Sequence, residues 1–182
     1  MKQHILPFEA PDTKIRLMFG DEAAFGRISE ISKSWAPPGV RPLVPYMIVR
    51  EHIQVYGAVD PNDGEQCYII APKCNTEWTN EFLKVLSERF SNDYILLAWD
   101  NASWHKSKTL IVPDNIRLFY LPPRTPEMNP VEQVWPEVRV AFKNKIFNSL
   151  NDVVDKLCCS LISLHNSDIQ NITARQWIID MF

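Results

Sequence analysis

The chain has 182 residues, of which 46% are hydrophobic and 23% charged, proportions typical of one globular domain with a substantial core. Its longest apolar run, Tyr94 to Trp99, is too short to span a membrane, and residues 1–12 lack the apolar centre of a signal peptide. The net charge of −3 argues against a general nucleic-acid binder, although residues 101–145 carry seven basic and four acidic side chains. We therefore expect a cytoplasmic protein with one basic region.

The N-terminal part of the chain reads as strands. Residues 1–13 are interpreted as a tail and residues 14–182 as one domain, which starts with a strand that is apolar at both parities and ends near Asp21. The proline-rich residues 34–45 are expected to form an ordered loop with Trp35 buried in the core. Residues 46–71 hold two β-branched and aromatic runs around the turn sequence DPNDG, which predicts an antiparallel hairpin.

The remaining elements alternate between helices and strands. A helical stripe over residues 75–90 begins at an Asn75/Thr76 cap. Two strands follow, residues 94–99 and residues 116–121, with a short helix between them. This order predicts an α/β fold in which a mixed sheet is flanked by helices.

Helices are predicted for the rest of the chain. Asn129 and Pro130 are typical of a helix start, and Pro136 predicts a kink just after Glu132. Residues 150–165 and 173–182 are expected to form a last helical pair that covers one face of the sheet. The four cysteines show no zinc-binding spacing, so we expect reduced, packed thiols.

Three carboxylates stand out. Asp21 and Asp100 each follow a buried strand, and Glu132 lies in the first turn of a helix, so neighbouring strand ends would bring them together. Three adjacent carboxylates repel by about 1 to 4 kcal/mol per pair at 4 Å, so a cation is required. Oxygen-only ligands favour Mg²⁺ or Mn²⁺, and two such ions suit attack on a phosphodiester. Taken alone, an aspartate at a strand end is more often a turn former or helix cap, and a glutamate in a first helical turn is often only a favourable charge near the helix N-terminus. The alternation of side chains along the strand does not decide whether Asp21 or Glu22 faces the metal.

Three segments carry a family resemblance: "GDEAAFGR", "WDNASWHKS" and "LPPRTPEMNPVEQVW". They resemble the catalytic blocks of the DDE domain of mariner-like transposases, in the bacterial insertion-sequence branch, and the likeness spans roughly residues 15–146. The resemblance implies an RNase H-like fold with a mixed five-stranded sheet. It also implies a DDE transposase and endonuclease in which Asp21, Asp100 and Glu132 bind two Mg²⁺ or Mn²⁺ ions and cut and join DNA at transposon ends.

The resemblance suggests roles for further residues. Asn101 and His105 match family positions beside the second aspartate, where they would orient Asp100 or contact a phosphate, and for His105 ordinary packing is an equal alternative. The candidate DNA contacts are Arg124, Arg139 and Lys143, the last two on the predicted helix of Glu132, although a solvated basic face is the commoner meaning of such charges.

The resemblance also implies partners. They are the DNA of transposon ends and target and a second copy of the chain in a homodimer. Trp35 and Gly39 match a loop that takes part in dimer and DNA contacts in mariner relatives, although core burial is the expected role of Trp35 taken alone. A separately encoded helix-turn-helix protein is a further partner, because about a dozen residues precede the first strand. Such a protein would act at the bacterial nucleoid. The alternative is a catalytically silent remnant that serves as a dimerisation or DNA-docking module, which the acidic net charge favours. A host nuclease such as a junction resolvase fits the proline-rich third block poorly.

Overall fold

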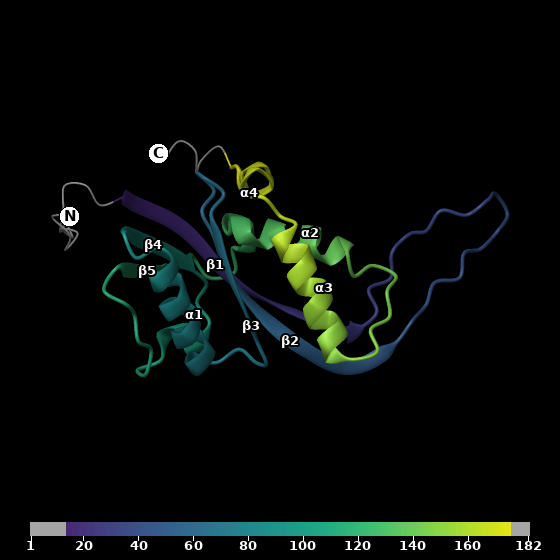
Figure 1. Ribbon diagram of the computed structural model, residues 1–182, viewed down its shortest axis with the longest axis horizontal. Helices are drawn as coiled ribbons and strands as arrows, with labels where there is room; N and C mark the ends of the chain where they lie inside the picture. Colours follow the sequence, from purple (N-terminus) through teal and green to yellow (C-terminus); the bar gives the residue numbers. More distant parts are fainter. Residues whose placement is uncertain (1–13, 176–182) are drawn as a thin grey trace.

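The computed structural model describes residues 14–175, and its centre is a twisted five-stranded sheet with the order β3-β2-β1-β4-β5 (Figure 1). The pairs β1–β2 and β2–β3 are antiparallel, whereas β1–β4 and β4–β5 are parallel. The predicted mixed sheet is confirmed. Its strands are β1 (Lys14–Ile28), β2 (Ile48–Val59), β3 (Gln66–Ala71), β4 (Asp93–Trp99) and β5 (Ile116–Tyr120).

Strand β1 serves both halves of the sheet. It pairs with β4 from Lys14 to Phe19 and with β2 from Phe19 onward. Successive side chains point to opposite faces, so Phe19 enters one core cluster and Met18 the other, as the two-sided apolar pattern predicted. The predicted end of the strand near Asp21 is wrong, because pairing with β2 carries β1 on to Ile28.

The predicted hairpin is formed by β2 and β3, and a buried arginine ties its turn to the rest of the sheet. Arg16 Nη1 donates to Asp60 at 2.9 Å and to Asp63 at 2.8 Å, and Arg16 Nε donates to Asp93 at 2.8 Å. Asp60 and Asp63 belong to the turn, whereas Asp93 begins β4. One guanidinium therefore joins the hairpin, β1 and β4.

Different helices cover the two faces of the sheet (Figure 1). On one face, α1 starts at the predicted cap Asn75, whose side chain accepts from Trp78 N at 3.0 Å, and buries Phe82. On the other face, Trp135 of α2 and Leu157 of α3 join the core. The helices are α1 (Thr76–Arg89), α2 (Val134–Val140), α3 (Leu150–Ile162) and α4 (Asn166–Thr173).

The helix predicted after the proline loop consists of two parts. A 3-10 turn, η3 (Pro130–Gln133), carries Glu132 and begins at the predicted cap Asn129, and α2 follows directly. Pro136 therefore lies in the first turn of α2, where a backbone N–H has no intrahelical acceptor and proline is tolerated. The predicted interruption after Glu132 is present, as a change of helix type rather than a kink.

The C-terminal helices agree only in part with those predicted from the sequence. Helix α3 is confirmed, and Ser149 and Asp152 form a capping box at its start. Helix α4 was not predicted. The helix predicted over residues 173–182 lies largely outside the described residues, and its first residue, Thr173, ends α4.

Residues 29–47, between β1 and β2, form a long loop that projects from the sheet (Figure 1). Trp35 and Leu43 are 103% and 96% exposed, so the predicted burial of Trp35 is wrong. No residue of this loop belongs to either core cluster of the described residues, so Trp35 lies outside the packing that would bury it. Its base is fastened by Asn144, which accepts from Ser32 N at 2.9 Å and donates to Ser32 O at 3.2 Å.

Two further expectations concern the thiols and the membrane. The four cysteines are all free; Cys67 is buried, but Cys159 is exposed, so the expected packing does not apply to every thiol. Among residues 14–175, no helix combines the length and apolarity needed to cross a membrane.

A candidate metal-binding active site beside the end of β4

The two aspartates singled out in the sequence lie on neighbouring strands. The last pair between the parallel strands β1 and β4 joins Phe19 to Ala98. Continuing this register by two residues places Asp21 beside Asp100. Asp21 thus lies within β1, at the level where β4 has just ended, and Asp100 is the first residue after β4.

A single asparagine brings Glu132 to the same place. Asn129 is buried, and its Oδ1 accepts from Val131 N at 3.3 Å to cap η3. Its Nδ2 donates to the carbonyl oxygen of Gly20 at 2.9 Å. The turn that carries Glu132 is therefore fastened to the backbone next to Asp21.

The three carboxylates line one cavity of about 360 Å³. The loop from Leu121 to Pro126 forms another part of its wall, and within it Arg124 adopts a left-handed backbone conformation with φ of 62°. The structure thus brings together five of the predicted site residues: Asp21, Asp100, Asn101, Glu132 and Arg124.

Asp21 and Glu132 are carboxylates in surroundings that disfavour negative charge. Burial raises the pKa of Asp21 to about 7, and Glu132 and Glu22 add to this, although a hydrogen bond from Trp135 opposes the shift. That bond runs from Trp135 Nε1 to Asp21 Oδ2 at 2.7 Å. The pKa of Glu132 is also raised, by burial and by the neighbouring charge of Asp100.

Asp100 differs because two donors hold it. Its Oδ1 accepts from Ala102 N at 3.0 Å and lies 2.9 Å from His105 Nδ1. The hydrogen bond from His105 lowers the pKa of Asp100, against the effect of burial. Since both contacts end on Oδ1, they leave Oδ2 of this half-exposed side chain as a possible cation ligand.

The structure distinguishes the roles of Asp21 and Glu22. The alternation of side chains along β1 turns Asp21 toward Trp135 and turns Glu22 toward the opposite face. There, Glu22 Oε1 lies 2.7 Å from His105 Nε2. Asp21 is therefore the residue that shares the cavity with Asp100 and Glu132.

His105 is a fully buried link between two carboxylates. Burial by itself would lower its pKa, but the hydrogen bonds to Asp100 and Glu22 raise the pKa to about 9, so the ring is protonated at neutral pH. The ring also packs on Trp99, with centroids 4.1 Å apart. The expected contact with Asp100 is thus present, together with close packing.

Glu22, Asp100 and His105 also place potential ligand atoms within 4.8 Å of one another, and among the described residues they are the group that meets this spacing. Each ring nitrogen of His105, however, already faces a separate carboxylate. Hydrogen bonds between the imidazole and these two carboxylates therefore account for this cluster. The oxygen donors around the cavity are the better match to Mg²⁺ or Mn²⁺.

Asn101 connects the ends of two strands. Its Nδ2 donates to the carbonyl oxygen of Leu121 at 2.5 Å, and its Oδ1 accepts from Lys106 Nζ. These bonds link the segment after β4 to the segment after β5. An orienting contact from the Asn101 side chain to Asp100 is not among the hydrogen bonds of the described residues.

The basic residues expected to contact DNA occupy different surroundings. Arg139 pairs with Glu30, and its Nη2 donates to the carbonyl oxygen of Ala24 at 2.8 Å, so it fastens α2 to β1. Lys143 is exposed but lies beyond the end of α2, so the expected placement on one helix with Glu132 is wrong. Arg124 is the member of the set that lines the cavity.

Sequence reasoning missed Trp135 at this site, and it considered Glu22 only as an alternative to Asp21, not as a partner of His105. Trp135 lies one helical turn after Glu132, and a buried indole N–H requires an acceptor, which is a signal that could have linked it to an aspartate. Glu22 could have been separated from Asp21 only by its partner His105, which is distant in the sequence.

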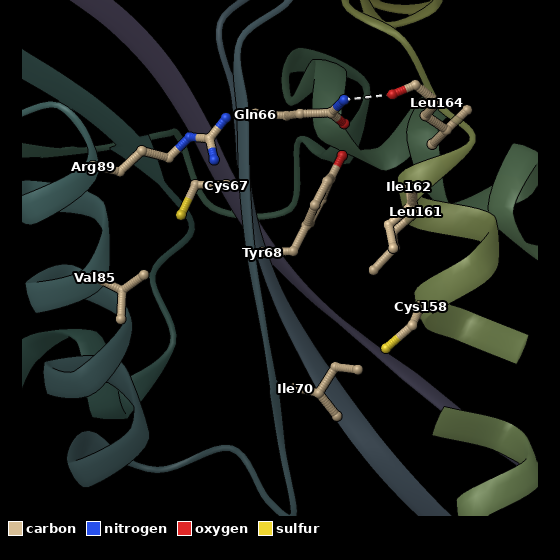
Figure 2. Close-up of a pocket in the computed structure, with 10 residues that line it drawn as sticks. All are labelled: Gln66, Cys67, Tyr68, Ile70, Val85, Arg89, Cys158, Leu161, Ile162 and Leu164. Atoms are coloured by element: carbon tan, nitrogen blue, oxygen red, sulfur yellow. Dashed lines mark hydrogen bonds between the residues drawn. The ribbon is translucent and has the colours of Figure 1, made fainter. Parts of the chain in front are cut away.

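A second cavity, of about 450 Å³, wraps around the edge strand β3 (Figure 2). Val85 of α1 lies on one side of the strand, and Cys158 and Leu161 of α3 lie on the other (Figure 2). Its wall is mostly apolar, and Gln66 Nε2 donates across it to the carbonyl oxygen of Leu164 at 2.6 Å. It has no carboxylate among its lining residues, so the smaller cavity is the candidate active site.

The fold and the cavity define the class of protein: an RNase H-like domain with acidic side chains gathered beside the end of a central strand. The sequence matches the family described as DDE superfamily endonuclease over residues 16–154, and the chain belongs to this family. It is also 37% identical over 127 residues to the uncharacterized protein y4pE/y4sA of Sinorhizobium fredii, covering 68% of this chain and 94% of that protein.

Solved structures with the same fold include three Mos1 complexes, each of which covers 87% of this chain. The pre-cleavage Mos1 transpososome aligns with a TM-score of 0.69 at 13% identity, and the Mos1 mariner paired-end complex with Mn aligns with a TM-score of 0.66 at 18% identity. The Mos1 strand transfer complex aligns with a TM-score of 0.65 at 16% identity. The chain spans about half the length of these Mos1 chains, 50% to 52%.

Proposed function

We propose that this domain cuts DNA at transposon ends and joins it to target DNA, using two Mg²⁺ or Mn²⁺ ions bound by Asp21, Asp100 and Glu132. The observation that carries the proposal is the meeting of these three carboxylates around one cavity in a DDE endonuclease fold. Support also comes from related folds, since Mos1 structures include a strand transfer complex and paired-end complexes with Mn and with Mg.

The residues of the cavity fit this role. Burial and neighbouring carboxylates raise the pKa values of Asp21 and Glu132, and a bound cation would offset the cost of charging them. When bound, the ions supply activation of a water or a DNA 3′-hydroxyl and stabilise the leaving oxygen. Trp135 and His105 hold the two aspartates in place, and Arg124 in the cavity wall is a candidate contact for a DNA phosphate.

The proposal extends to partners. Recognition of the transposon ends is assigned to a separate helix-turn-helix protein or segment, because the domain spans about half of the Mos1 chains. Asn101, Arg139 and Lys143 stay candidates for phosphate contacts, with Arg139 restrained by its pair with Glu30. The exposed loop of residues 29–47 is the proposed contact with a second copy of the chain.

An activity assay separates this function from that of a silent remnant. Wild-type protein with Mn²⁺ should nick supercoiled plasmid and join preprocessed ends taken from the DNA that flanks its gene. Asp100→Asn should reduce both reactions to background, whereas Asp114→Asn, at an exposed aspartate outside the cavity, should leave them unchanged. Equal activity in Asp100→Asn and wild type would refute the proposal.

Calorimetry gives a second comparison. If the domain is active, the wild type should bind Mn²⁺ and the Asp100→Asn variant should not. A remnant that serves only as a docking module should show no carboxylate-dependent uptake.

A further inference from the structure

Glu22 is a buried carboxylate whose purpose the carboxylate cavity does not explain. Its side chain is 7% exposed, and the cavity that contains Asp21 and Asp100 is lined without it. A buried charge is costly unless it is paired, and the partner of Glu22 is His105, whose Nε2 lies 2.7 Å from its Oε1. Glu22 therefore acts on whatever His105 touches.

His105 transmits this contact to Asp100. Its ring has no exposed surface and is packed between Trp99 and Trp104, with centroids 4.1 and 5.7 Å away, so it has little freedom to move. With Nε2 directed to Glu22, the other nitrogen faces Asp100 Oδ1 at 2.9 Å. An acceptor that binds one ring nitrogen fixes the orientation of the whole imidazole, and so the direction in which the other nitrogen points.

Asp100 needs such an anchor. It follows the end of β4, its side chain is 54% exposed, and Ala102 N is its other donor, at 3.0 Å. Without Glu22, the Nε2–H of His105 would be a buried donor with no acceptor, and this cost would destabilise the packed position in which Nδ1 faces Asp100.

We infer that Glu22 is a positioning residue, which through His105 holds Asp100 Oδ1 and so presents the remaining oxygen of Asp100 to the cation. The inference rests on the proposed function, because it concerns the orientation of a proposed metal ligand. Adjacent carboxylates of β1 thus serve one site from opposite faces of the sheet, Asp21 directly and Glu22 through an imidazole.

Mn²⁺ titration by calorimetry tests this inference on the full chain. Glu22→Leu keeps the volume but removes the acceptor, and it should raise the Kd for Mn²⁺ by about tenfold or more. Glu22→Gln retains an acceptor oxygen and should fall between wild type and Glu22→Leu. Glu51→Gln, on β2 and paired with Arg27, is the matched control and should bind as wild type.

Cleavage kinetics distinguish positioning from general damage. In Glu22→Leu, the Mn²⁺ concentration for half-maximal rate should rise by a similar factor, while kcat at saturating Mn²⁺ should return to within about twofold of wild type. If Glu22→Leu fails to fold, His105→Gln interrupts the same contact at its centre and should show the same loss of affinity.

The outcomes separate the two proposals. Wild-type protein that takes up no Mn²⁺ through Asp100 refutes the proposed function. If the wild type takes up Mn²⁺ and the folded Glu22→Leu or His105→Gln variant binds it equally well, the role of Glu22 alone is overturned. A loss of kcat in Glu22→Leu that saturating Mn²⁺ does not restore would also overturn it.

Discussion

Asp21 is held in an environment that suits it as a ligand and strains it as a free carboxylate. Its pKa of about 7 arises mainly from burial and secondly from the charges of Glu132 and Glu22, and the indole of Trp135 relieves only part of it. A group whose pKa is higher in the folded than in the unfolded protein stabilises the fold at low pH and loses this contribution as the pH rises through its folded pKa. Without metal, the free energy of unfolding should therefore fall as the pH rises from about 4 to about 7, because Asp21 ionises in the folded protein.

Asp21→Asn should remove that loss. In EDTA, wild-type protein should lose about 2 to 3 kcal/mol of unfolding free energy between pH 5 and pH 8 relative to the variant, because the carboxylate ionises and the amide does not. Urea unfolding at the two pH values measures this difference, and other titrating groups cancel in the comparison. Mn²⁺ at pH 8 should stabilise only the wild type. Parallel pH curves for the two proteins would contradict the raised pKa.

At the scale of residues, the sequence could indicate which carboxylates are candidates for the site, but it could not predict most of their hydrogen-bond partners. Asp21, Asp100 and Glu132 could be selected because each residue lies beside the end of a strand or at the start of a helix. The choice between Asp21 and Glu22 needed His105, whose position depends on the packing of two tryptophans rather than on any local pattern.

At the scale of elements, the site depends on a close approach between β2 and α2. Gly57 is the partner of Asp21 in the antiparallel pair of β1 and β2. A Cβ at this position would lie 2.7 Å from Trp135 Cη2 and 2.8 Å from Tyr68 Cδ1. The missing side chain therefore makes room for the indole that holds Asp21.

Gly57→Ala should destabilise the fold by about 1 to 3 kcal/mol through overpacking. Trp135→Phe removes the outer ring that meets the new methyl group, so the double variant should cost less than the sum of the single variants. Urea unfolding of wild type, both single variants and the double variant gives the coupling energy. Additive costs would show that Gly57 does not make room for Trp135.

The ion cluster at Arg16 connects three elements in the same way. Its guanidinium is almost fully buried against Asp60, Asp63 and Asp93, whereas Arg89 forms a half-exposed pair with Glu65 at 3.3 Å. Removing one partner of a buried ion pair leaves uncompensated charge, but an exposed pair contributes little.

Arg16→Met should therefore lower the unfolding free energy by about 3 to 5 kcal/mol. Arg89→Met, the matched control, should lower it by about 1 kcal/mol or less. Chemical denaturation at pH 7 measures both values. Similar losses in the two variants would mean that the cluster does not hold the hairpin, β1 and β4 together.

Elements that depend on local patterns were predictable, and those that depend on distant partners were not. The caps and apolar stripe of α1 and the turn of the hairpin are encoded within a few residues. The extension of β1 to Ile28 is not, because it follows from pairing with β2. The division between η3 and α2 follows from Pro136, whose presence was noted but whose place in a first turn was not.

At the scale of the whole molecule, the strand order is what makes a site from distant residues. Placing β4 next to β1 brings Asp100 beside Asp21, and the bond from Asn129 to Gly20 adds Glu132. The fold class could be predicted from the order of strands and helices and from the family resemblance. The course of residues 29–47 could not, because none of them belongs to either core cluster of the described residues, and their contacts at the base are with residues distant in the sequence, such as Asn144.

That loop carries the last prediction. Trp35 and Leu43 of this loop are almost fully exposed and belong to neither core cluster of the described residues, and large apolar side chains exposed on a projecting loop are candidates for protein contacts. If the occupant is a second copy of the chain, Trp35→Ser and Leu43→Ser should weaken self-association without lowering the melting temperature, since neither side chain supports the fold. Sedimentation velocity over a range of concentrations, with and without transposon-end DNA, measures the effect. Ile111→Ser, at a 70% exposed apolar residue outside the loop, should behave as wild type. Loop variants that sediment as wild type under both conditions would remove this loop from the dimer.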